Sequence, residues 1–209
     1  MMFRFLRFSL PAALVFMAAP ALAEVGAKTG YVEGGVGFLV GDSDDGTDPI
    51  LGYGEARLES SPLIDFRFGG FFTEHFGMEG QVWYSPSDLE FEFQGAELGN
   101  LDVDIWGFDA SIVLCPNPSG EYNFLVLGGI GYLNGDIDLN IPGEDSSESE
   151  DSTTLHVGAA GRINVTDNVY IRPDARYLYV EGFDLFGSGK ESRLNFFTIS
   201  VNVGFIFGK

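Results

Sequence analysis

Bulky apolar side chains recur at every second position of the stretch NFFTISVNVGFIF, which covers residues 195–207. Strict alternation of this kind predicts a β-strand with two unlike faces. One face carries Phe197, Ile199, Val201, Val203, Phe205 and Phe207, and the other carries Thr198, Ser200, Asn202 and Gly204. The two faces must therefore meet different surroundings.

Seven other segments of about ten residues show the same two-residue period, which is the weak signature of a membrane-spanning barrel. They cover residues 29–40, 63–74, 76–85, 102–114, 123–134, 154–165 and 169–180. No helical spacing of apolar residues at three and four positions competes with this period. Together with the C-terminal stretch they make eight strands, the smallest common size of an outer-membrane barrel.

The connections between these segments alternate in length. Short turns rich in Gly, Pro and Asn occur at 73–77 (TEHFG), 116–122 (PNPSGEY) and 166–168 (TDN). Long segments lie at about 41–61, 86–101, 135–152 and 181–192. We therefore predict an all-β fold, an eight-stranded antiparallel up-and-down transmembrane β-barrel. Its long acidic loops would be extracellular, and its short turns would be periplasmic, on the same side as both termini.

A soluble barrel and a membrane barrel both have one apolar face, so two further observations decide between them. The polar face here carries Gly, Ser, Thr and Asn with few charges, whereas the outside of a soluble barrel would carry Lys and Glu. Aromatic residues also gather in two groups near strand ends, as expected at two membrane interfaces. The groups are Tyr84, Trp106, Tyr132, Tyr177 and Tyr179 toward the long loops, and Phe72, Phe76, Phe205 and Phe207 toward the short turns. Both observations favour a membrane barrel.

The first 23 residues, MMFRFLRFSLPAALVFMAAPALA, predict a cleaved export signal. Arg4 and Arg7 form its basic end, and an apolar run and a small-residue cleavage site follow. The predicted organisation is a signal peptide at 1–23 and an outer-membrane barrel at 24–209. Acidic residues number 31 against 11 Lys and Arg, so nucleic acid is not an expected partner, because phosphate contacts need clustered cations. Cys115 is the sole cysteine, so no internal disulfide is expected.

Charged residues also fall on the polar face of the predicted strands. They are Glu33, Asp65, Arg67, Glu79, Asp109, Arg162, Arg172, Asp174 and Arg176. Mixed charges inside a narrow barrel should form ion pairs, because an unpaired buried charge is energetically expensive. We therefore predict a lumen plugged by a salt-bridge network. The alternative is a gate whose salt bridges exchange partners to admit ions.

Most of the acidic residues lie in the four long segments. Their mutual repulsion would keep the loops solvated and extended at the cell surface. Alternatively, the loops would bind divalent cations shared with lipopolysaccharide, or a basic extracellular protein. GDSDDGTD at 41–48 is the nearest match to a calcium loop, but it lacks the distal Glu of an EF-hand and is flanked by predicted strands. No metal or cofactor site is therefore predicted.

Several segments resemble the OmpX- and OmpA-like family of small outer-membrane barrels. VGFIF at 203–207 is similar to the terminal assembly signal of such barrels, and the resemblance assigns that role to Val203, Gly204, Phe205 and Phe207. GGIGYL at 128–133 and GAAGRINVTDNVYIRPDARYLYV at 158–180 are similar to their strands. The resemblance implies location in the Gram-negative outer membrane, contact with its lipid and lipopolysaccharide, and insertion by the barrel assembly machinery. We expect a monomer.

Small barrels that modify lipid A need a His near a Ser, and only His75 and His156 are available. His75 lies in a predicted turn, and His156 lies near the predicted outer rim of its strand, with Gly158 where the deacylase pattern has Ser. No residue is therefore predicted to be catalytic. The predicted function is a non-enzymatic surface barrel that contributes to outer-membrane integrity or adhesion through acidic loops. A narrow, OmpW-like conduit for small or hydrophobic solutes is the alternative, and a lipid A-modifying enzyme is less favoured.

Overall fold

The computed structural model describes residues 29–41, 54–58, 60–93, 96–118, 122–141, 144–183 and 192–208. The predicted export signal and, apart from Gly41, the acidic stretch at 41–48 lie outside these residues. The described chain consists of β-strands and the turns between them, in agreement with the all-β prediction. A helix long and apolar enough to cross a bilayer does not occur within it.

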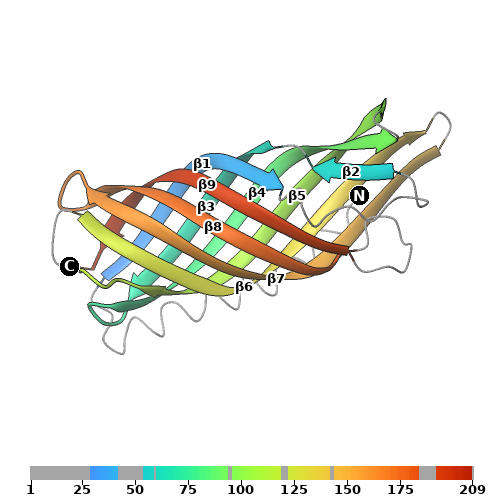
Figure 1. Cartoon of the computed structure of the whole chain (residues 1–209). Coiled ribbons are helices and arrows are strands. Elements are labelled where there is room, and N and C mark those ends of the chain that lie inside the picture. The colour runs from blue at the N-terminus through green and yellow to red at the C-terminus, as the bar shows by residue number, and fades with distance from the viewer. Residues whose placement is uncertain are drawn as a thin grey trace.

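The described residues form nine strands in one antiparallel sheet that closes on itself (Figure 1). The strands are β1 (Thr29–Gly41), β2 (Gly54–Leu58), β3 (Ser61–Phe71), β4 (Phe76–Phe93), β5 (Ala96–Leu114), β6 (Tyr122–Ile141), β7 (Glu144–Asn164), β8 (Val169–Phe183) and β9 (Ser192–Phe207). Their order is β2-β4-β3-β1-β9-β8-β7-β6-β5, and pairing of β4 with β5 closes the barrel. β1 and β9 pair from Gly30 opposite Phe207 to Gly41 opposite Phe196, so the first and last described strands meet along one seam.

β2 and β3 act as one wall strand, because both pair with the same edge of β4. Leu58 lies opposite Leu89 and Ile64 lies opposite Tyr84, so the register changes by one residue between the two segments. The wall of the barrel therefore contains eight strands, as predicted. The predicted loop at 41–61 is wrong in part, because β2 extends the wall strand into it.

The predicted loops at 86–101 and 135–152 are wrong, because both segments form hairpins of paired strands. β4 pairs with β5 as far as Phe93, and β6 pairs with β7 as far as Ile141, while β8 and β9 both reach into the predicted loop at 181–192. Figure 1 shows the two hairpins extending beyond the ends of β1 and β9. Backbone pairing needs no apolar face, so the extension of β7 at 144–152, which is polar on both faces, lacks the two-residue period used to predict strands. The extensions of β4 and β6 do alternate, at Leu89, Phe91 and Phe93 and at Ile137, Leu139 and Ile141, so the predicted bounds of these two strands are too short.

The two ends of the barrel thus differ. We call the end with the long β4–β5 and β6–β7 hairpins the hairpin end, and the opposite end the turn end. At the turn end, residues 72–75 connect β3 to β4 and residues 165–168 connect β7 to β8, as short bends. Thr29 and Phe207, the outermost residues of β1 and β9, also lie at the turn end.

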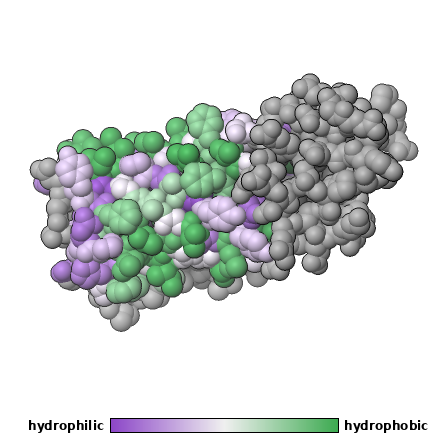
Figure 2. Space-filling view, viewed as in Figure 1, coloured by the Kyte–Doolittle hydropathy of each residue, from purple (hydrophilic) through white to green (hydrophobic). Residues whose placement is uncertain are grey.

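The outward face of the wall is apolar and the middle of the inward face is polar, the reverse of a soluble barrel. Val36, Val157 and Val203 point outward and are 58–66% exposed. Figure 2 shows hydrophobic residues spread over the described part of the wall. An apolar surface this continuous is stable in lipid rather than in water, so the wall is a membrane-spanning surface.

Aromatic residues lie on the outward face toward both ends of the wall. Exposed positions are Tyr84, Tyr132 and Tyr177 on the hairpin side, and Phe72, Phe76, Phe205 and Phe207 on the turn side. On the hairpin side the Trp106 ring packs 5.6 Å from the Tyr132 ring, between centroids, and its Nε1 donates to Asn134 Oδ1 at 2.6 Å. The Tyr84 hydroxyl donates to Asp104 Oδ1 at 2.6 Å. Rings with an apolar body and a hydrogen-bonded polar tip suit a membrane interface.

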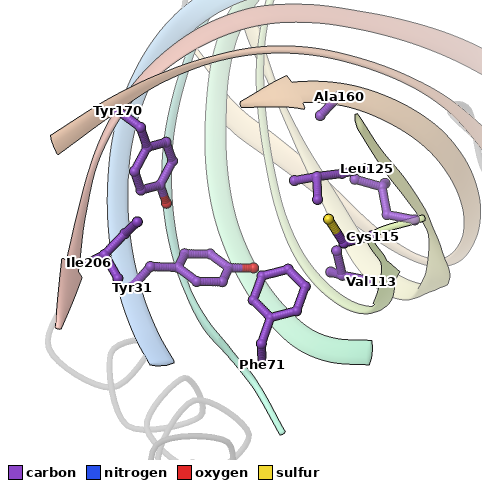
Figure 3. Close-up of a cluster of buried hydrophobic side chains, with 9 residues drawn as sticks. Tyr31, Phe71, Val113, Cys115, Leu125, Ala160, Tyr170 and Ile206 are labelled. Atoms are coloured by element: carbon purple, nitrogen blue, oxygen red, sulfur yellow. The ribbon is translucent and has the colours of Figure 1, made fainter. Parts of the chain in front are cut away.

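A cluster of apolar side chains fills the barrel interior near the turn end (Figure 3). It contains Tyr31, Phe71, Val113, Cys115, Leu125, Leu127, Ala160, Tyr170 and Ile206.

His75, in the turn between β3 and β4, joins this turn to the end of β5. Its carbonyl accepts the Cys115 N–H at 2.7 Å, and its ring Nδ1 lies 2.9 Å from the Cys115 carbonyl oxygen. The described contacts of His75 are those of a turn residue, as predicted from its position.

Cys115 should resist alkylation in the folded barrel. Its side chain is 1% exposed, and burial raises the pKa of its thiol, so little of the reactive thiolate is present at neutral pH. We expect maleimide labelling to be at least about tenfold slower in the folded protein than in denaturant. Mass spectrometry of timed samples measures both rates, and equal rates would contradict the burial of this residue.

Candidate functional site

The interior of the barrel is the candidate functional site, because charged side chains converge there from opposite walls. Alternation along β1, β3, β4, β5, β7 and β8 turns all nine predicted residues inward, and eight of them are 0–4% exposed. They are Glu33, Asp65, Arg67, Glu79, Asp109, Arg172, Asp174 and Arg176. We call these residues without Asp109 the central network.

Arg172 joins three carboxylates in the middle of the central network. Its Nη1 donates to Glu33 Oε1 at 3.0 Å and to Glu79 Oε2, and its Nη2 donates to Asp174 Oδ2 at 3.0 Å. β8 carries Arg172 and β4 carries Glu79, and these strands are four apart in both directions around the eight-stranded wall. The contact between Arg172 and Glu79 therefore crosses the width of the barrel.

Two further arginines share these carboxylates. Arg176 donates from Nη2 to Glu79 Oε1 at 2.6 Å and from Nε to Asp174 Oδ1 at 2.9 Å. Arg67 donates from Nη2 to Asp65 Oδ2 at 2.5 Å, and its Nη1 lies 2.8 Å from Asp174 Oδ2. Glu79 and Asp174 each contact more than one guanidinium group, so the network is continuous. Such charge-assisted contacts hold both partners in a fixed geometry.

Two tyrosines complete the network, and the sequence analysis missed them. The Tyr31 hydroxyl donates to Glu79 Oε2 at 2.8 Å, and the Tyr170 hydroxyl donates to Glu33 Oε1 at 2.5 Å. Tyr31 stands two positions before Glu33, and Tyr170 stands two positions before Arg172. The inward period that identified the charged residues therefore also contained the signal for both tyrosines.

Asp109 lies beside the central network and contacts a histidine rather than an arginine. It accepts a hydrogen bond from Trp83 Nε1 at 2.8 Å, and its Oδ1 lies 3.6 Å from His156 Nδ1. His156 Nε2 lies 2.7 Å from Ser111 Oγ, with the donor set by the ring tautomer. His156 is buried inside the lumen, so its predicted place near the outer rim is wrong. The reason is that β7 begins at Glu144, ten residues before the predicted strand.

Two glycines of β6 allow side chains of β5 and β7 to meet across it. Gly129 lies opposite both Ser111 and His156, and Gly131 lies opposite Asp109. A β-carbon at Gly131 would collide with the Asp109 carboxylate, and one at Gly129 would collide with the backbone of β5. The glycine-rich stretch of β6 thus makes room for the contact between Ser111 and His156.

Ser111, His156 and Asp109 have the composition of a nucleophilic relay, which requires consecutive hydrogen bonds. The 3.6 Å between His156 Nδ1 and Asp109 Oδ1 is too long for a hydrogen bond. All three side chains are 2–3% exposed and face the lumen, so the serine is not presented to the lipid side of the wall. Within the described residues, no group of three His, Cys, Asp or Glu side chains is arranged to hold a metal ion.

Arg162 does not belong to the central network, which corrects its predicted place. Its Nε and Nη2 donate to Asn123 Oδ1 at 3.1 and 2.8 Å, and its guanidinium lies 5.6 Å from the Phe71 ring centroid. It also lies 5.5 Å from the Tyr170 ring centroid, and the hydroxyl of that ring bonds Glu33. Alternation predicts the face of a strand but not the depth along it, and Arg162 lies near the turn end of β7.

The residues of the predicted assembly signal lie on β9 at its seam with β1. Val203, Phe205 and Phe207 point outward and are 48–58% exposed, whereas Gly204 is buried on the inward face. The three apolar side chains are therefore presented to lipid. Their role in assembly stays a prediction.

Known proteins share the fold described above. Residues 9–207 match the sequence profile of the family described as outer membrane protein beta-barrel domain. Similar solved structures include OprG from Pseudomonas aeruginosa, with a TM-score of 0.69 and 13% identity over 88% of this chain and 98% of OprG. Neisserial surface protein A gives 0.61 and 16% over 85% and 97%, and Ail of Yersinia pestis gives 0.52 and 18% over 87% and 99%. Identities this low show the fold alone, and none of the curated proteins matches the sequence.

Proposed function

The chain belongs to the outer membrane protein beta-barrel domain family, so we propose that it acts in the outer membrane as a non-enzymatic barrel with a closed lumen. In this proposal it reaches the membrane by its export signal and contributes to membrane integrity or to adhesion through the hairpin end. The observation that carries the proposal is the pair of contacts from Arg172 and Arg176 on β8 to Glu79 on β4.

The width of the barrel supports a closed lumen. An eight-stranded barrel has an interior just wide enough for side chains to fill. Here Arg67, Arg172 and Arg176 are 0–1% exposed, and their contacts reach across the interior. An ion that crossed this layer would have to separate buried ion pairs. Each charge left without its partner would cost several kcal/mol.

Planar-bilayer recording tests the closed lumen. The wild-type protein should give no reproducible ion-sized current steps. Replacing Arg172 and Glu79 together with alanine removes the contact that crosses the barrel and keeps the net charge of the interior. We expect this double variant to show more frequent openings than wild type, because two large side chains no longer fill the centre.

Arg162→Gln is the matched control for this recording, since it removes an inward arginine that lies outside the central network. It should stay as silent as wild type. Regular steps from the wild-type protein would overturn the closed lumen and favour the alternative function, a narrow conduit for small solutes.

Trimming one hairpin separates membrane integrity from adhesion. Ile137 of β6 lies opposite Glu148 of β7, so residues 138–147 can be replaced by an Asn-Gly turn at a paired position. In a deletion strain, the trimmed protein should restore resistance to a chelator if the barrel alone supports the membrane. Loss of surface adhesion with intact chelator resistance would assign adhesion to the hairpin.

The non-enzymatic part of the proposal has its own test. We expect the mass spectrum of lipid A to be the same with and without the protein. A mass shift that disappears in Ser111→Ala would show that the serine beside His156 acts as a nucleophile, and the proposal would then fail.

A further inference from the structure

A cavity opens at the turn end of the barrel, on the side of the apolar cluster away from the central network. Its volume is about 250 Å³, and its lining includes Thr29, Phe71, Thr73, Glu74, Asn123 and Arg162. Arg162 brings a positive charge to this cavity, in a protein with 31 acidic and 11 basic residues. The lining therefore carries one cation, Arg162, beside one carboxylate, Glu74.

Among the described residues, Arg162 has no carboxylate partner, unlike the other three inward arginines. Arg67, Arg172 and Arg176 each contact carboxylates. Among the described residues, Arg162 forms no ion pair, and its hydrogen bonds go to the neutral amide oxygen of Asn123. Its positive charge is thus not held in an ion pair with a described side chain.

The guanidinium of Arg162 is nevertheless held in place. Asn123 Oδ1 accepts from both Nε and Nη2, and the rings of Phe71 and Tyr170 lie at 5.6 and 5.5 Å from Arg162 Cζ. The two hydrogen bonds fix one edge of the guanidinium group, and among the described residues no hydrogen bond from Nη1 accompanies them. An immobilised guanidinium group that lines a cavity can donate hydrogen bonds to a negatively charged ligand.

We propose that Arg162 binds a single carboxylate group that enters the cavity from the turn end. The ligand class is a small carboxylic acid or the C-terminal carboxylate of a short peptide. One free nitrogen and its two N–H donors suit one carboxylate, and the Glu74 carboxylate in the same lining disfavours a doubly charged phosphate. Asn123 positions the guanidinium and does not itself contact the ligand in this arrangement.

The probes are acetate, N-acetylalanine and acetyl-alanyl-alanine, added at constant ionic strength to the full chain in detergent micelles. Nuclear magnetic resonance follows the backbone amides of Phe71 and Asn123. We expect saturable shifts with all three acids and none with the amide of N-acetylalanine, which has the same shape without the charge. Tighter binding of acetyl-alanyl-alanine than of acetate would assign the site to a peptide end, and the reverse would assign it to a free small acid.

Two variants of the cavity lining should change the affinity in opposite directions. Arg162→Gln should weaken binding at least about tenfold, because a charge-assisted hydrogen bond is lost. Glu74→Gln should tighten it about threefold, because a like charge is removed from a partly solvated site. The far-ultraviolet circular dichroism of the β-sheet shows whether each variant is folded, and Glu74→Gln decides alone if Arg162→Gln is not.

Three results would each overturn the proposal. They are absence of saturable shifts, equal binding of the acid and its amide, and unchanged affinity in a folded Arg162→Gln protein. Stronger binding of inorganic phosphate than of acetate would also reject the carboxylate assignment. None of these outcomes depends on whether the lumen conducts, so this test is independent of the proposed function.

Discussion

Replacing Arg172 with alanine should lower the free energy of unfolding by about 3–5 kcal/mol, the range found when one partner of a buried ion pair is removed. The variant would leave the carboxylates of Glu33, Glu79 and Asp174 without the guanidinium that joins them. Arg176 and Arg67 still lie within 2.9 Å of Glu79 and Asp174, whereas the guanidinium that remains near Glu33 is that of Arg67, with Nη1 at 3.9 Å, so the loss should fall on Glu33 most strongly. Denaturant titration in detergent or lipid vesicles measures the change.

Arg162→Ala is the matched control, because Arg162 is inward but contacts no carboxylate among the described residues. We expect its cost to be no more than about 1–2 kcal/mol, the value of its hydrogen bonds and ring contacts. In the Arg172→Ala protein, Glu33→Gln should restore part of the stability, since it removes a charge that has lost its closest cation. An equal loss from both arginine variants would contradict the separation of Arg162 from the central network.

Val201→Arg should destabilise the barrel in lipid vesicles by about 2–4 kcal/mol, the cost of a cation on the lipid face near the bilayer midplane. Val201 points outward and is 52% exposed, midway on β9 between the aromatic residues Phe197 and Phe205. Unfolding by guanidinium in vesicles, read from tryptophan fluorescence, measures the difference from wild type.

Val165→Arg is the control for this substitution. Val165 is 58% exposed, similar to Val201, but it lies in the turn between β7 and β8 and outside the strands. Its cost should stay below about 1 kcal/mol, since a cation near the interface meets water and headgroups. Equal effects of the two substitutions would show that the wall at Val201 does not face hydrocarbon.

The fold was predictable because membrane strands carry a two-residue period that backbone geometry imposes. The eight wall strands follow from it, and so does the inward face that buries Glu79 and Arg176. The period does not report the depth of a residue along a strand. It therefore predicts the same network for Arg162 and for Arg172, although Arg172 lies deeper in the barrel. It also fails where both faces of a strand are polar, as at 144–152, so it does not predict the extension of β7.

The partners of His156 were unpredictable for a different reason. Its contact with Ser111 spans an intervening strand, and it exists because Gly129 has no side chain in the way. Ser111, Gly129 and His156 are brought together by the order and register of β5, β6 and β7. The spacing of residues in the sequence predicts neither the strand order nor the register.

The contacts across the lumen constrain the order in which the barrel assembles. Glu33 and Arg172 are 139 positions apart, and Glu79 and Arg172 are 93 apart, so neither pair can form until late strands reach early ones. A complete but open sheet would turn the three guanidinium groups and four carboxylates of the central network toward hydrocarbon, where each is costly. The charged side of the sheet should therefore stay away from hydrocarbon until β1 and β9 pair and close the barrel.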